Sequence, residues 1–211
     1  RLSTVADGDP DYRVLTGLEA WFALPATPAS HPPVRWKMAT LTWLGCMPAL
    51  ASTAHPSTLD TGMRLDQCRS APVQALRFIE VGVASIWRDS CDQRAQALAP
   101  PLLLEFTYRR EVPGSAFSRS ATAMLERNVN PATFADLKQR IEAFNSHYRD
   151  IGDGDSYQLR YLSDGRLELL LNNELLASEQ GHEFANAYLQ IWFGPKPYSE
   201  RLKEQLLAIR Q

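Results

Sequence analysis

The segment YQLRYLSDGRLELLLNNELL (residues 157–176) has the pattern of successive β-strands joined by tight turns. An Asp-Gly pair at 164–165 separates two apolar stretches, and this dipeptide favours the two-residue turn of a β-hairpin. An Asn-Asn pair at 172–173 then turns the chain into ELLASEQ (174–180). The segment therefore predicts an antiparallel meander of three strands.

Helical patterns flank this meander on both sides. On the N-terminal side, Asn130 is a capping residue and Pro131 occupies the first helical position. On the C-terminal side, Gly194 and Pro195 end an apolar stripe of helical period. The expected helices are residues 115–127, 131–148, 181–193 and 199–209.

Two earlier segments predict further strands. ALRFIEVGVASIW (75–87) and LLLEFTYRR (102–110) are rich in the β-branched and aromatic residues typical of strands. The element order is then two strands, two helices, the meander and two more helices. Such separated runs indicate an α+β domain, an antiparallel β-sheet covered on one face by a layer of α-helices. We expect residues 55–211 to form this single domain.

An export signal is predicted at residues 34–54. A short basic region precedes a mostly apolar run of 13 residues, 38–50, which is too short to span a bilayer of ~30 Å. Ser52 and Ala54 are small residues at the positions that a signal peptidase reads, so the mature protein is expected to begin at His55 and to be periplasmic or secreted. The alternative is a buried core helix, which an internal proline and a Pro-rich flank disfavour.

Residues 1–33 precede this signal and show few periodic features. The first methionine of the chain is Met38. We therefore interpret 1–33 as a disordered, non-native upstream extension, with translation starting at Val34 or Met38. A genuine N-terminal extension is the alternative.

Composition narrows the possible partners. The chain has 22 basic and 24 acidic residues and no long basic run, which argues against binding to nucleic acid. No apolar stretch of 18 residues follows the signal, so no membrane span is predicted in the mature protein. The four histidines lack zinc spacing, and the aspartates at 150, 153 and 155 lack the ligand register of a calcium loop. No metal or cofactor is expected.

Two cysteines, Cys68 and Cys91, remain after the predicted cleavage. In an oxidising compartment they could form a disulfide. Two separate thiols are the alternative, because the sequence does not fix the distance between them.

A cluster of cationic and phenolic residues lies on the first two predicted strands. Arg77, Tyr108, Arg109 and Arg110 could bring a guanidinium close to a phenol, a combination suited to binding a carboxylate. Solvated arginines at strand ends are the alternative.

Several segments resemble the bacterial chalcone isomerase-like proteins, over roughly residues 64–209. They are FIEVGVASIW (78–87), LEFTYRREVPGSAFSRSATAMLERN (104–128), GDSYQLRYLSDGRLELLLNNELL (154–176) and FANAYLQIWFGPKPYSERLKEQLL (184–207). The most specific pieces are the Ile-Trp-Phe-Gly-Pro turn and the Gly-Asp before the meander. The resemblance implies the chalcone isomerase fold, an antiparallel sheet backed by a helical layer.

The catalytic groups of the plant chalcone isomerases are not matched in this chain. Their strand threonine, helix tyrosine and asparagine, and late threonine correspond to Gly82, Phe117, Met124 and a position near Ile191. Their arginine corresponds to Arg77 or Arg69. Because donors at the developing charge are missing, the resemblance implies that no catalytic residue is present and favours a binding protein over an enzyme.

The same fold includes fatty-acid-binding proteins in which an arginine and a tyrosine hold a carboxylate above an apolar cavity. The resemblance therefore implies a small hydrophobic or amphipathic ligand, carboxylate-bearing and similar to a fatty acid. The expected ligand-binding residues are Arg77, Tyr108, Phe117, Met124 and Ile191. An intramolecular lyase (isomerase) with altered residues and an interaction protein without a pocket are the alternatives. A cavity of several hundred Å3 would favour binding over interaction.

Overall fold

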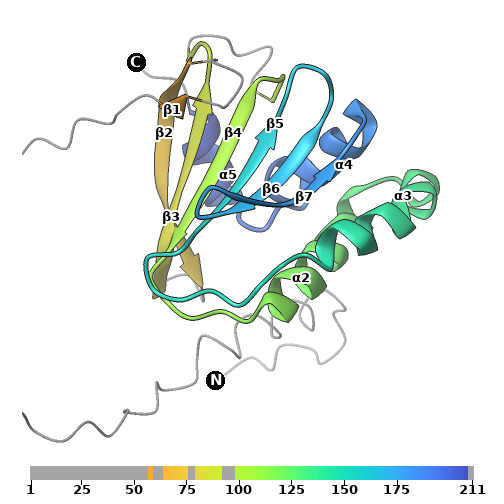
Figure 1. The fold of residues 1–211 in the computed structure, drawn as a ribbon, viewed down its shortest axis with the longest axis horizontal. Coiled ribbons are helices and arrows are strands. Elements are labelled where there is room, and N and C mark those ends of the chain that lie inside the picture. Colours follow the sequence, from red (N-terminus) through yellow and green to blue (C-terminus); the bar gives the residue numbers. More distant parts are fainter. Residues whose placement is uncertain (1–56, 59–63, 76–78, 92–97, 209–211) are drawn as a thin grey trace, which may run out of the picture.

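The structure is a computed structural model that describes residues 57–58, 64–75, 79–91 and 98–208. These ranges form a seven-stranded antiparallel sheet and four helices (Figure 1). The strands are β1 (Ser57–Thr58), β2 (Arg64–Ala75), β3 (Ile79–Arg88), β4 (Leu102–Tyr108), β5 (Ser156–Tyr161), β6 (Leu167–Leu171) and β7 (Glu174–Glu179). The helices are α2 (Gly114–Asn128), α3 (Pro131–Asn145), α4 (His182–Phe193) and α5 (Glu200–Leu207). No helix in these ranges is long and apolar enough to cross a bilayer.

The sheet is a meander throughout, because the strands lie side by side in chain order from β1 to β7. The predicted turns lie between β5, β6 and β7. Gly165 has φ +89°, and Asn172 and Asn173 have φ 50° and 70°. These left-handed conformations are those that glycine and asparagine adopt most easily. The predicted α+β class and the three-strand meander are confirmed.

The start of the sheet differs from the prediction. The sequence pattern predicts a first strand at 75–87, whereas β2 already ends at Ala75 and β3 begins at Ile79. Strand β2 (RLDQCRSAPVQA) was missed because it contains charged residues and Pro72. Its alternation is also interrupted by a bulge at Cys68, where the pairing with β3 shifts between Gln67 and Arg69.

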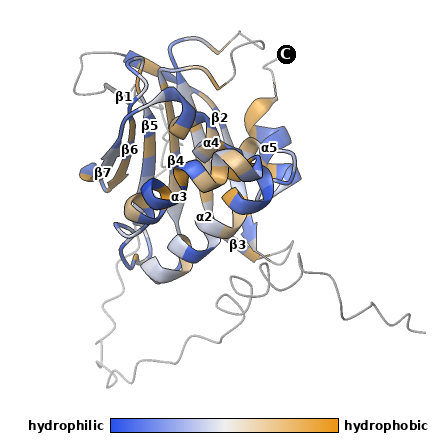
Figure 2. Ribbon diagram, turned by 90° about the vertical axis from the view of Figure 1, so that its right-hand side faces the viewer, coloured by the Kyte–Doolittle hydropathy of each residue, from blue (hydrophilic) through white to orange (hydrophobic). Residues whose placement is uncertain are grey.

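The helices cover one face of the sheet (Figure 2). Leu102, Leu104 and Phe106 alternate along β4 and pack in one core with Leu125 of α2 and Tyr188 of α4. A second, smaller cluster contains Leu103, which points to the opposite face of β4 because successive side chains alternate. Its other members are Leu65, Trp87 and Leu162. The sheet is therefore apolar on both faces, with the larger core under the helices.

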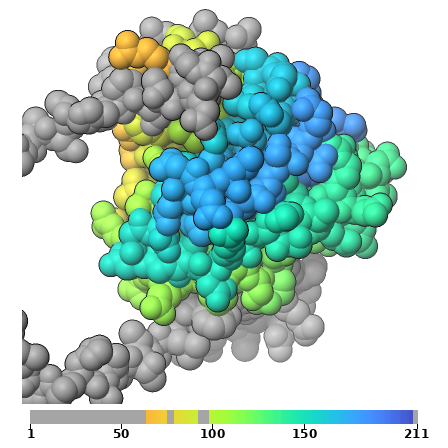
Figure 3. All heavy atoms as spheres, in the orientation of Figure 1, coloured from red at the N-terminus to blue at the C-terminus, as the bar shows by residue number. Residues whose placement is uncertain are grey.

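An ion pair attaches the helix layer to the far edge of the sheet. Arg140 of α3 donates to Glu179 Oε1 of β7 from Nε and Nη2, at 2.9 and 2.6 Å. The same guanidinium lies 5.2 Å from the centre of the Phe184 ring on α4. Helix α3 and the meander consequently share a continuous surface in the space-filling view (Figure 3).

A disulfide joins Cys68 of β2 to Cys91, which follows β3. The Cα atoms are 5.1 Å apart. Cys68 is the extra residue of the bulge, and its side chain is buried. Of the two alternatives left by the sequence, the structure has the bonded one.

We predict that this disulfide stabilises the fold by closing a loop of about 24 residues, which corresponds to about 3.5 kcal/mol of unfolding free energy. Replacing both cysteines (Cys68→Ser with Cys91→Ser) should lower the free energy measured by urea unfolding by this amount. Reductant should destabilise the native protein in the same way and leave the double variant unchanged. Two titratable thiols in denatured, unreduced protein lacking Cys46 would contradict the prediction.

Candidate functional site

A cavity of about 70 Å3 lies between the sheet and the helices and is partly open to solvent. Strands β2, β3 and β4 form one wall, and helices α2 and α4 with the residues that follow α3 and α4 form the rest. Most of the lining is apolar or aromatic and includes Val73, Val81, Phe106, Ala121 and Trp192. The cavity thus borders the main core and has a mostly apolar wall.

Four of the five residues expected to bind a ligand line this cavity. They are Tyr108 from β4, Phe117 and Met124 from α2, and Ile191 from α4. Tyr108 and Phe117 meet edge to face with ring centres 5.3 Å apart. The fifth, Arg77, lies outside the described residues. The structure therefore brings four of them together, and the ligand-binding role of all five remains a prediction.

Other lining residues were not singled out from the sequence. Tyr148 follows the end of α3, and Tyr198 lies in the turn between α4 and α5. Trp192 belongs to the Ile-Trp-Phe-Gly-Pro sequence that carried the family resemblance, and this was the available signal. Val73 belongs to the strand that was missed, so nothing in the pattern indicated it.

A bulge in β3 determines which residue enters the cavity from this strand. Val73 pairs with Gly82, and Gln74 pairs with Glu80, so Val81 is an extra residue on β3. Val81 is buried and lines the cavity. A Cβ atom added to Gly82 would lie 2.2 Å from the carbonyl oxygen of Thr107 on β4. Gly82 is therefore required by the close approach of β4, and the position cannot hold the threonine of the plant enzymes.

The polar side-chain groups at the cavity are hydroxyls and the indole N–H of Trp192. Tyr108, Tyr148, Tyr198 and Ser120 line it, and no charged side chain does so among the described residues. Burial raises the pKa of Tyr108 well above its usual value, and the neighbouring tyrosines raise it further. Burial also raises the pKa of Tyr148. These phenols stay neutral at physiological pH, so they act as hydrogen-bonding groups and not as bases.

The aspartates near the meander hold backbone groups. Asp150 Oδ1 accepts from the N–H of Gly114 at 2.8 Å, at the start of α2. Asp155 accepts from the N–H of Gly152 at 2.7 Å and from Asn172 Nδ2 at 2.8 Å. These two bonds lower the pKa of Asp155. The described ranges contain no group of three or more side chains arranged to bind a metal.

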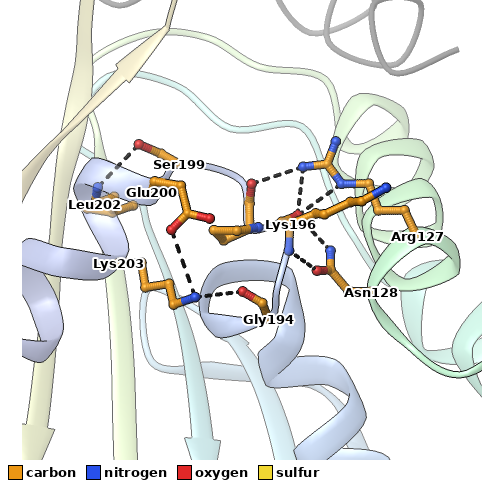
Figure 4. A network of polar contacts seen from close by, with 9 residues as sticks. Arg127, Asn128, Gly194, Lys196, Ser199, Glu200, Leu202 and Lys203 are labelled. Carbon is orange, nitrogen blue, oxygen red and sulfur yellow. Dashed lines mark hydrogen bonds and ion pairs between the residues drawn. The ribbon is translucent and has the colours of Figure 1, made fainter. Parts of the chain in front are cut away.

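The turn that carries Tyr198 is held from α2 by side-chain contacts to its backbone (Figure 4). Arg127 donates to the carbonyl oxygens of Lys196, at 3.0 and 2.7 Å, and of Pro197, at 2.9 Å. Asn128 accepts from the N–H of Lys196 at 2.6 Å and donates to its carbonyl at 2.8 Å. We call Arg127 and Asn128 the turn clamp. It positions one wall of the cavity.

The sequence profile of the family described as chalcone isomerase-like matches residues 73–208. The matched region contains β3 to β7, the four helices and every described residue of the cavity wall. The chain belongs to the chalcone isomerase-like family. No curated protein matches it.

Among solved structures, the fold is similar to that of a fatty-acid binding protein of Arabidopsis thaliana. The identity is 12%, the TM-score is 0.50, and the match covers 72% of this chain and 96% of the plant protein. At this identity the similarity concerns the fold alone.

We predict that Gly82 cannot be replaced. Gly82→Ala should reduce the unfolding free energy by about 3 kcal/mol, because the new methyl group would overlap the Thr107 carbonyl. Gly152→Ala is the matched control, since a Cβ there would meet only Asp155 Oδ2, at 3.8 Å. Equal midpoints of the two variants in urea unfolding would contradict the prediction.

Proposed function

We propose that this protein is an exported, non-catalytic binding protein for a small amphipathic ligand that carries a carboxylate. The observation that carries the proposal is the cavity, where four residues expected from the family resemblance meet in an apolar, partly open space. Membership of the family and the fold similarity to a fatty-acid binding protein support the same interpretation. A bacterial source and a periplasmic or secreted location belong to the proposal.

The chemistry of the cavity supports binding over catalysis. Cyclising a chalcone requires a stabilised phenolate and donors that meet the enolate charge as it forms. Gly82 has no room for a side chain, and Phe117, Met124 and Ile191 provide no donor. The phenols that are present have raised pKa values, which disfavours their use as bases.

The volume of the cavity limits the ligand. About 70 Å3 is below the several hundred Å3 expected, and below the ~300–1,000 Å3 of pockets that enclose drug-sized molecules. Aromatic side chains such as Trp192 and Phe117 occupy much of the space between the layers. We therefore propose a ligand that is short, or one whose longer part leaves the cavity through its open side.

The polar end of the ligand is assigned to Tyr108 and Arg77. Tyr108 lines the cavity, and its neutral hydroxyl can donate its proton to a carboxylate oxygen. The charge itself requires a cation. Arg77 follows β2 in the sequence and is the cation we propose, although it lies outside the described residues.

We predict that Arg77→Leu weakens binding of hexanoate by about 1.5–3 kcal/mol, the range of a hydrogen bond to a charged group. Binding of hexan-1-ol, the uncharged analogue, should change little. Arg119→Leu, which removes an exposed arginine of α2, is the control and should affect neither ligand. Titration calorimetry on the mature protein measures both affinities.

Equal losses for the two ligands would assign a structural role to Arg77. Failure of both ligands to bind the unmodified protein, together with no ligand found by mass spectrometry of the purified protein, would favour the interaction protein. Turnover of a chalcone by the unmodified protein would contradict the non-catalytic proposal.

We also predict that the exported protein begins at His55, because Ser52 and Ala54 match the cleavage preference of a signal peptidase. N-terminal sequencing of protein from the periplasm or medium of a bacterial host tests this. Ala54→Leu should block cleavage, and Ala51→Leu, at a less constrained position, should leave it unchanged. Intact residues 1–54 on cytoplasmic protein would count against export.

A further inference from the structure

We infer that Tyr148 presents a hydrogen-bond acceptor, and no donor, to the cavity, so the bound molecule carries a hydroxyl group in addition to its carboxylate. This inference rests on the proposed binding function and specifies the class of ligand: hydroxylated amphipathic acids. It follows from the direction of a hydrogen-bond chain that runs from the core to the cavity.

The chain links three helical segments through the core. The Tyr148 and Tyr188 hydroxyl oxygens are 3.0 Å apart, and Tyr188 Oη is 2.6 Å from Asn145 Oδ1. Asn145 Nδ2 is 3.0 Å from Thr122 Oγ1, and Thr122 Oγ1 is 3.0 Å from the carbonyl oxygen of Ser118. Asn145 and Tyr188 are fully buried, so these groups have no access to water.

Counting protons fixes the direction of each bond. The Asn145 Oδ1 atom can only accept, so Tyr188 must donate its single hydroxyl proton to it. Tyr188 then has no proton left for its neighbour and can only accept from Tyr148. The proton of Tyr148 is therefore directed into the core. The Tyr148 oxygen can still accept a hydrogen bond from another group, but it has no second proton to donate.

The other end of the chain fixes the orientation of the amide. The carbonyl of Ser118 accepts the Thr122 hydroxyl proton, so Thr122 can only accept from Asn145. If the Asn145 amide were turned over, its oxygen would face the Thr122 oxygen, and one of the two bonds would be lost. The lost bond would be that between Thr122 and the Ser118 carbonyl, and such a hydrogen bond contributes about 0.5–1.5 kcal/mol. The observed orientation is the one that keeps all four hydrogen bonds of the chain.

Tyr148 is also placed to meet a ligand. It lines the cavity, and its ring stacks on that of Phe117 with centres 5.5 Å apart. Phe117 in turn contacts Tyr108, whose neutral hydroxyl can donate a hydrogen bond. The cavity therefore offers a donor at Tyr108 and an acceptor at Tyr148. A carboxylate near Tyr148 would meet lone pairs, whereas a hydroxyl would donate to them.

Two isomeric probes separate these cases: butan-1-ol, which can donate a hydrogen bond, and methyl propyl ether, which can only accept one. The measured quantity is the ratio of the dissociation constant of the ether to that of the alcohol. Tyr148→Phe should lower this ratio about fivefold, the effect of one neutral hydrogen bond. Tyr161→Phe is the matched control, because this buried phenol bonds to His182 Nδ1 at 2.7 Å and does not line the cavity.

Tyr188→Phe gives a test of opposite sign. Removing the Tyr188 oxygen leaves the Tyr148 proton without its acceptor, so it becomes available to the cavity. The ether should then bind about fivefold more tightly than to the unmodified protein, while the alcohol changes little. The ratio of the two dissociation constants is measured on one and the same variant, so it does not depend on the overall stability of that variant. Circular dichroism checks that each variant is folded.

An unchanged ratio in Tyr148→Phe, or a loss of ether affinity in that variant, would overturn the inference and leave ligand binding intact. No gain for the ether in Tyr188→Phe would overturn it as well. If neither probe nor hexanoate binds to the unmodified protein, the proposed function fails, and the inference fails with it.

Discussion

The contact between four aromatic rings is the interaction on which both the fold and the cavity depend. Tyr108, Phe117, Tyr148 and Tyr157 come from β4, α2, the segment after α3, and β5, and their ring centres lie 5.1 to 6.5 Å apart. Each such pair contributes roughly 0.5–1.5 kcal/mol beyond the burial of its surface. The rings thereby attach the first helices to the centre of the sheet. Because three of them also line the cavity, changes that enlarge the cavity also weaken the attachment of the layers.

Local patterns in the sequence predict much of this architecture. The turns at 164–165 and 172–173 need left-handed backbone, and the residues present there favour it, so the meander follows from local chemistry. Asn130 accepts from the N–H of Ala132, and Ser199 accepts from that of Leu202, as their capping positions indicate. Strand β2 is different. Its polar residues and its bulge at Cys68 are accommodated by pairing with β3, a tertiary interaction that no local pattern records.

The residues of the site likewise fall into those that the sequence predicts and those that it does not. Phe117, Met124 and Ile191 were expected in the site because a family resemblance assigned positions to them, and position along a helix is preserved when the chain folds. Val81 reaches the cavity through a shift in strand pairing, which the alternation of residues along β3 conceals. The direction of the hydrogen bonds through Asn145 depends on which atoms face one another across three helical segments. Only the folded arrangement provides that information.

The turn clamp has a consequence for how the family can diversify. Arg127 and Asn128 bind the peptide groups of Lys196 and Pro197 and do not contact the side chains of these two residues through those bonds. They do require Gly194, where a Cβ would lie 2.6 Å from Asn128 Oδ1. Substitutions beyond Gly194 can therefore accumulate while the path of the main chain is preserved. Since Tyr198 projects from the turn into the cavity, the shape and polarity of that wall can be altered by natural selection independently of the scaffold. The clamp separates the evolution of ligand preference from the maintenance of the fold.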